Sequence, residues 1–76
     1  MPVSLAQLRV GERARVAGFS EQSAYTDQLV RLGLTPGTSL VLQRVAPLGD
    51  PVEIRFRGFS LVLRPAEGGA LMLERE

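Results

Sequence analysis

The segment 52–63 constrains the fold of this chain most strongly, because its pattern specifies a β-hairpin with a single register. Six large apolar residues alternate with other residues on either side of a turn: Val52, Ile54, Phe56, Phe59, Leu61 and Leu63. A two-residue turn at Arg57-Gly58 would pair these residues and place all six on one inward face. A slip of one residue would turn one strand's apolar set to solvent, so the register is well specified.

Glycine and proline divide the rest of the chain into short segments, which is typical of a small all-β barrel or sandwich. We expect strands at residues 13–17, 39–45 and 70–74, and single helical turns at residues 4–8 and 65–68. A type II turn is expected at residues 35–38, where Pro36 and Gly37 take the two central positions. With the hairpin, these segments predict a mainly β fold, a partly open barrel of five short strands.

One true helix is expected, at residues 23–32, between the first two strands. Tyr25, Leu29 and Leu32 lie at i, i+4 and i+7 and would form one apolar face. Ser23 is placed to cap the first turn. Gly33 is placed to take the left-handed conformation that ends a helix.

The composition argues against several classes of protein. The 76 residues suffice for one domain, 1–76, and contain no cysteine and no histidine, so the commonest transition-metal ligands and general bases are missing. The net charge of +1 gives no strong attraction to nucleic acid or anionic membranes. No apolar run is long enough to cross a bilayer, and the first residues do not read as a signal peptide. We therefore expect a cytoplasmic, non-enzymatic protein without membrane insertion.

The ordered motifs resemble the FeoA family over nearly the whole chain. The matching segments are 8–16 (LRVGERARV), 29–37 (LVRLGLTPG), 46–54 (APLGDPVEI), 57–58 (RG) and 61–64 (LVLR). The resemblance implies an SH3-like barrel and a role in bacterial ferrous-iron uptake. It also implies a partner, the membrane transporter FeoB, which carries a cytosolic GTP-binding domain. No cofactor or metal site is expected, since the carboxylates are scattered and oxygen ligands alone suit a selective ferrous site poorly.

The candidate partner-binding residues come from one loop, one strand position and the helix: Leu48, Gly49, Asp50, Val62, Tyr25 and Leu29. The loop 46–51 is held by two prolines, and such loops are common recognition surfaces. Two interpretations of Leu48 stay open, an exposed contact at the loop tip or a lid folded over the core. Val62 is apolar on the solvent face opposite Glu53. Tyr25 and Leu29 either belong to the core or present part of the helix to a partner.

Other functions remain as alternatives. Small barrels also bind nucleic acid through aromatic and basic surfaces, but the chain has only four aromatic residues. A binder of proline-rich peptides would need a groove of exposed aromatics, and tryptophan is absent. The arginines at positions 13, 15, 55 and 57 could share one face. An open sheet edge would also permit a homo-oligomer.

Overall fold

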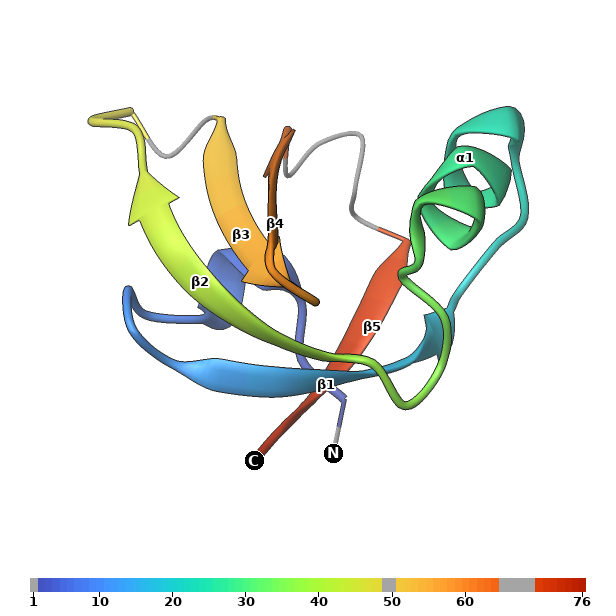
Figure 1. Ribbon diagram of the computed structural model, residues 1–76, viewed down its shortest axis with the longest axis horizontal. Helices are drawn as coiled ribbons and strands as arrows, with labels where there is room; N and C mark the ends of the chain where they lie inside the picture. Colours follow the sequence, from blue (N-terminus) through green and yellow to red (C-terminus); the bar gives the residue numbers. More distant parts are fainter. Residues whose placement is uncertain (1, 49–50, 65–69) are drawn as a thin grey trace.

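The computed structural model describes residues 2–48, 51–64 and 70–76 and contains the five expected strands (Figure 1). They are β1 (Arg13–Phe19), β2 (Ser39–Val45), β3 (Val52–Phe56), β4 (Phe59–Leu63) and β5 (Leu71–Arg75). The helix α1 (Ala24–Leu32) connects β1 to β2, and the 3-10 turn η1 (Leu5–Gln7) precedes β1. β1 runs two residues beyond its predicted end, and β5 lies one residue later than predicted. The predicted turn at 65–68 falls outside the described residues.

The strands form one antiparallel sheet in the order β4-β3-β2-β1-β5, and the sheet curls into a barrel. β4 pairs with β3 and β5 pairs with β1, and no pairing joins β4 to β5. The sheet therefore has two edges, and the predicted partly open barrel is confirmed. Among the described residues, no helix has the length and apolar character needed to span a membrane.

The β3–β4 hairpin has the predicted register, with Phe56 opposite Phe59, Ile54 opposite Leu61 and Val52 opposite Leu63. Arg57 and Gly58 have φ angles of 51° and 81°, the two positive values that a type I′ turn requires. Arginine is an uncommon residue in this conformation.

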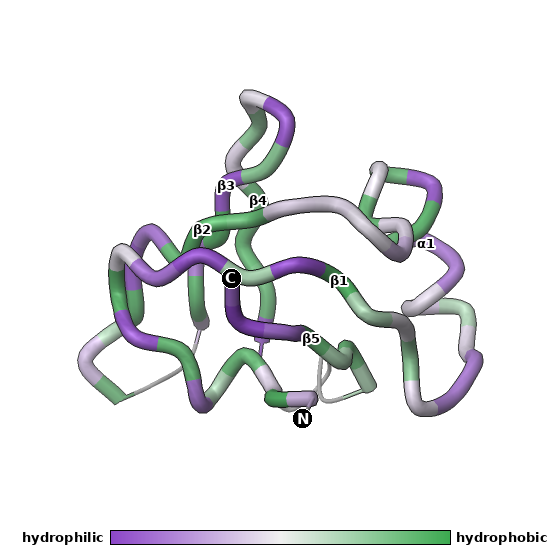
Figure 2. Tube along the Cα trace, turned by 90° about the horizontal axis from the view of Figure 1, so that it is seen from below, coloured by the Kyte–Doolittle hydropathy of each residue, from purple (hydrophilic) through white to green (hydrophobic). Residues whose placement is uncertain are grey.

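The prediction that Phe59 points into the core is wrong. Phe56 is buried, whereas Phe59 is 67% exposed; on the same face of β4, Leu61 is half-buried and Leu63 is buried. The reason is the position of β4 at the edge of the sheet, where the turn projects beyond the packed core. In Figure 2 this turn stands out from the sheet on the side where α1 also lies.

The helix has the predicted caps. The Ser23 hydroxyl accepts a hydrogen bond from the Thr26 N–H at 3.2 Å, and the helix ends at Gly33 with a φ of 113°. Leu34 follows and is buried, the apolar contact that often accompanies such an end. Leu29 is buried as its spacing predicts. Leu32 is not, although it belongs to the same predicted face.

The core combines the inward-facing residues of the strands with apolar residues from the helix and the N-terminal turn. The buried apolar residues of the main cluster are Leu5, Leu8, Ala14, Val16, Leu29, Leu34, Leu40, Leu42, Val52, Ile54, Phe56, Leu63, Leu71 and Leu73. The predicted type II turn at residues 35–38 is also present, since the Thr38 N–H donates to the Thr35 carbonyl at 3.0 Å and Gly37 has a φ of 93°. The alternation of apolar residues along the strands thus accounts for most of the core, and the residue types at positions 36 and 37 account for the turn.

Candidate functional site

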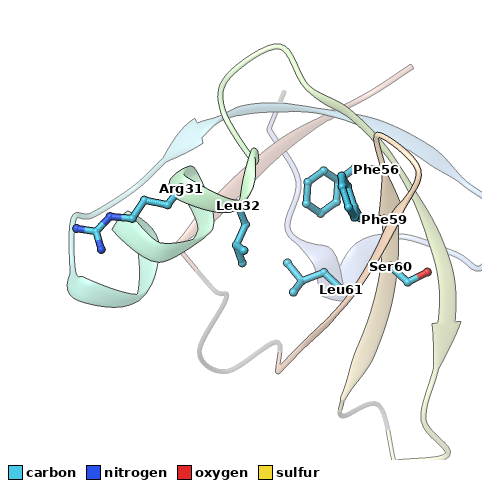
Figure 3. A pocket seen from close by; sticks show the side chains of 6 residues that line it. All are labelled: Arg31, Leu32, Phe56, Phe59, Ser60 and Leu61. Carbon is cyan, nitrogen blue, oxygen red and sulfur yellow. The ribbon is translucent and has the colours of Figure 1, made fainter.

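An apolar groove lies between the last turn of α1 and the β3–β4 hairpin (Figure 3). Its volume is about 290 Å³, and six residues line it: Arg31, Leu32, Phe56, Phe59, Ser60 and Leu61. In Figure 3 the Leu61 side chain extends toward the Leu32 side chain, and the rings of the paired residues Phe56 and Phe59 lie side by side. The Arg31 side chain extends away from the other five. The groove joins two elements that are distant in the sequence.

Large apolar side chains in this groove remain open to solvent. Leu32 is 48% exposed and Phe59 is 67% exposed, while Phe56 forms a buried floor. Of the four aromatic residues in the chain, Phe56 is buried, Phe19 and Tyr25 are half-buried, and Phe59 is exposed. Exposed apolar residues that gather around a hollow are more informative than isolated ones, because such patches mark interaction surfaces.

Gly33 brings the helix and the hairpin together. A Cβ atom at this position would lie 3.4 Å from Phe56 Cε2 and 3.9 Å from Arg57 Cδ and Nη1. Gly33 therefore combines a left-handed conformation with a close approach of the hairpin. The Arg57 guanidinium lies over the C-terminal end of α1, where a positive charge is favourable.

The predicted partner-binding residues do not form one cluster. Leu48 is 95% exposed, so the lid interpretation is wrong and the exposed interpretation holds. Val62 is exposed opposite Glu53, as predicted. Gly49 and Asp50 lie outside the described residues.

The two helix positions lie at or near the core. Leu29 is 2% exposed, so its assignment as a surface contact is wrong, because the helix packs this side of its apolar face inward. Tyr25 is half-buried and packs against the same core cluster. Neither residue lines the groove.

The exposed charges are distributed over several surfaces. Arg13 and Arg55 flank Val41 in neighbouring strands, so these two share a face as expected. Arg57 does not join them but lies over Gly33. Within the described ranges, no group of three or more histidine, cysteine, aspartate or glutamate residues could hold a metal ion.

Two other shallow pockets lie near β5 and are lined mainly by charged residues. One is lined by Arg15, Glu74, Arg75 and Glu76, and the other by Arg9, Val10, Glu12 and Arg75. Their charges are partly paired with one another, since Arg75 binds Glu12 and Arg15 lies 3.5 Å from Glu76. The Arg9 backbone N–H, with Arg75, lowers the pKa of the Glu12 carboxyl below its ordinary value, although partial desolvation opposes the shift. These contacts stabilise the β5 end of the sheet. The apolar groove is therefore the better candidate for a binding site.

The groove was not predicted, and the reason is geometric. The sequence places Phe59 and Leu61 on the same face as the core residues, and nothing local shows that the face continues past the core. One signal was present: β4, Phe59-Ser60-Leu61-Val62-Leu63, contains no charged residue, and an edge strand normally carries one.

Fold and groove together define a small, partly open β-barrel domain with an apolar surface groove. The FeoA domain family matches residues 3–75, so the chain belongs to the FeoA family, whose members are associated with ferrous-iron transport. The resemblance that the motifs indicated is confirmed.

Solved structures agree with this assignment. The FeoA protein from Chlorobium tepidum is 34% identical with a TM-score of 0.87, and the match covers 96% of this chain and 70% of that one. Iron(II) transport protein A from Clostridium thermocellum is 29% identical with a TM-score of 0.88, over 96% of this chain and 45% of that one.

A more distant structure, the zinc-complexed FeoA from Stenotrophomonas maltophilia, is described as a prokaryotic SH3 domain protein. It is 20% identical with a TM-score of 0.81, over 97% of this chain and 89% of that one. The SH3-like fold class is thereby confirmed.

Proposed function

We propose that this protein is a non-catalytic, cytoplasmic accessory factor that binds the cytosolic part of a FeoB-type ferrous-iron transporter and modulates its GTP-dependent transport. The observation that carries the proposal is the apolar groove of Leu32, Phe59 and Leu61 in a member of the FeoA family. A groove of this kind suits a protein partner, since aromatic and aliphatic side chains dominate the centres of interfaces.

The exposed tip of the 46–51 loop is a second candidate contact. Leu48 is almost fully exposed, and the Ala46 N–H donates to the Pro51 carbonyl at 3.0 Å, so the base of the loop is closed. The nucleic-acid alternative has little support, because binding of single strands uses several stacking aromatics and Phe59 is the one exposed ring.

The test is co-purification with the cognate transporter from detergent-solubilised membranes, with and without a GTP analogue. Wild type is compared with Phe59→Asp, Leu48→Asp and the control Val10→Asp, which places the same charge at an exposed valine outside the groove. We expect retention of wild type and Val10→Asp and loss of Phe59→Asp.

The remaining outcomes are equally informative. If Leu48→Asp is the only variant that fails to co-purify with the transporter, the contact lies at the 46–51 loop and not in the groove. Absence of retention of the wild-type protein in every nucleotide state would remove the proposed function.

A further inference from the structure

The groove adjoins an open sheet edge. β4 pairs with β3 and with no other described strand. In a hairpin closed by a two-residue turn, Phe56 and Phe59 form a hydrogen-bonded pair, and the pattern then alternates. Ser60 and Val62 therefore direct their backbone N–H and C=O groups away from β3. These groups have no backbone partner among the described residues.

This edge lacks the features that normally prevent strand pairing. Its five residues include no charge, no proline and no bulge, and its register with β3 is regular. Four of the five residues are apolar, and the fifth is Ser60. Unprotected edges of this kind pair with another chain unless something covers them, and the groove would receive side chains from a strand added there.

Three arginines and one acid surround β4 among the described residues of the hairpin. Arg57 precedes the strand, Arg64 follows it, and Arg55 lies opposite Ser60 on the outer face. None of the three forms an ion pair with another described residue. The acid, Glu53, lies opposite Val62 and pairs with Arg44 at 3.9 Å. The described residues around the edge thus carry an excess of positive charge, because the three arginines have no ion-pair partner among them.

This excess of positive charge argues against a second copy of the chain as the occupant. Antiparallel pairing of two β4 strands about Leu61 would place Gly58 of one copy opposite Arg64 of the other. Arg57, the residue before Gly58, would then lie near Arg64 of the other copy at both ends of the dimer, and these like charges would repel. Carboxylates in the added strand would instead interact favourably at both ends.

We propose that β4 accepts an extended acidic segment of the transporter as an added strand, with alternate apolar side chains of that segment seated in the groove. Main-chain hydrogen bonds from Ser60 and Val62 would supply affinity, and the groove would select the side chains, as in other complexes formed by strand addition. This inference rests on the proposed function for the source of the segment. It adds the mode of binding and the chemistry of the segment.

The experiment uses overlapping 12-residue synthetic peptides that cover the cytosolic regions of the cognate transporter. Each peptide is added to the isotope-labelled full chain, and exchange of backbone amides with solvent is followed by NMR. We expect a peptide with alternating apolar residues and several carboxylates to slow exchange at Ser60 and Val62 by about tenfold or more. Salt should weaken the binding, because part of it is electrostatic.

A pair of variants separates backbone from side-chain effects. Val62→Pro removes an edge N–H that does not serve the β3–β4 ladder, and proline is tolerated in edge strands for this reason. It should weaken peptide binding about fivefold or more, through the lost hydrogen bond. Val62→Thr keeps the N–H and should bind as wild type does. Ser60→Pro provides a second test of the same edge if Val62→Pro fails to fold.

The outcomes distinguish this inference from the proposed function. If the transporter is retained but no peptide protects Ser60 and Val62, and Val62→Pro is also retained, strand addition is wrong and the proposed function stands. If these amides become protected with rising protein concentration alone, the occupant is a second copy and the inference is wrong. If acidic peptides protect these amides while the intact transporter is not retained, β4 does accept an added strand. The assignment of that strand to the transporter is then wrong.

Discussion

The two edges of the sheet differ in how their backbone groups are covered. At the β5 edge, Val3 and Leu73 exchange two hydrogen bonds of 2.7 and 2.9 Å, so the N-terminal segment covers the middle of the strand. Arg75 binds Glu12 and donates to the Gln7 carbonyl at 2.8 Å. At the β4 edge no described segment pairs with the strand, and the neighbouring apolar side chains are exposed.

This difference shows that the β5 edge contributes contacts to the folded domain, whereas the β4 edge presents backbone and apolar groups at the surface. A chain of this length has little core to spare, so covering one edge with its own N-terminal segment contributes to folding. The β4 edge receives no such contribution from the described residues, and Phe59 and Val62 stay exposed there.

The largest expected effect compares leucines on the two edge strands. Leu73→Ala on β5 removes a fully buried side chain and should lower the free energy of unfolding by about 2–5 kcal/mol. Leu61→Ala on β4 removes a half-buried side chain and should cost only about 1 kcal/mol. Urea unfolding followed by circular dichroism measures both. Equal losses would mean that the groove is closed in solution and that the contrast between the edges is false.

The next effect concerns the junction between the helix and the hairpin. Gly33→Ala forces a φ of 113° on alanine and brings its Cβ to 3.4 Å from Phe56 Cε2, so it should cost about 1–3 kcal/mol. Gly37→Ala is the matched control, because its φ is also positive but no atom lies within 4 Å of the added Cβ. Thermal unfolding should show a greater loss at Gly33. Equal losses would show that contact with Phe56 adds nothing to backbone strain.

A smaller effect compares the two edges directly. Val3→Pro removes an N–H that donates to the Leu73 carbonyl and should lower stability by about 1 kcal/mol. Val62→Pro removes an N–H on the open edge and should change stability by less than about 0.5 kcal/mol. The measurement is again the free energy of unfolding. A large loss for Val62→Pro would show that the β4 edge is covered within the chain itself.

The smallest expected effect is an acid dependence at the β5 edge. The pKa of Glu12 is lowered, first by the Arg9 backbone N–H and then by Arg75. The folded state therefore binds this proton less readily than the unfolded state. The contribution is present above the ordinary glutamate pKa and is lost as the pH falls through the lowered value.

The melting temperature should thus decrease less on acidification in Glu12→Gln than in wild type. Both proteins would be measured across about pH 6 to pH 3, which spans the ordinary glutamate pKa. Identical pH profiles would show that Glu12 does not contribute to the covered edge.

Most of the architecture could be predicted, and particular residues show why. The hairpin register follows from the alternation around Arg57-Gly58, and the ends of the helix follow from Ser23 and Gly33. Each of these depends on neighbours a few residues away. The site could be predicted only in part: Leu48 and Val62 are exposed as surface candidates must be, but Leu29 is buried and the groove was missed.

The sequence by itself determined the strands, the turns, the caps and the membership of the FeoA family, because these depend on local periodicity, backbone preference and ordered motifs. Only the tertiary structure decided which apolar residues are covered. Phe56 and Phe59 are paired neighbours on one face, yet one is buried and the other exposed. Exposure depends on where the sheet ends and how closely α1 approaches it at Gly33. That distance is set by packing between residues far apart in the chain.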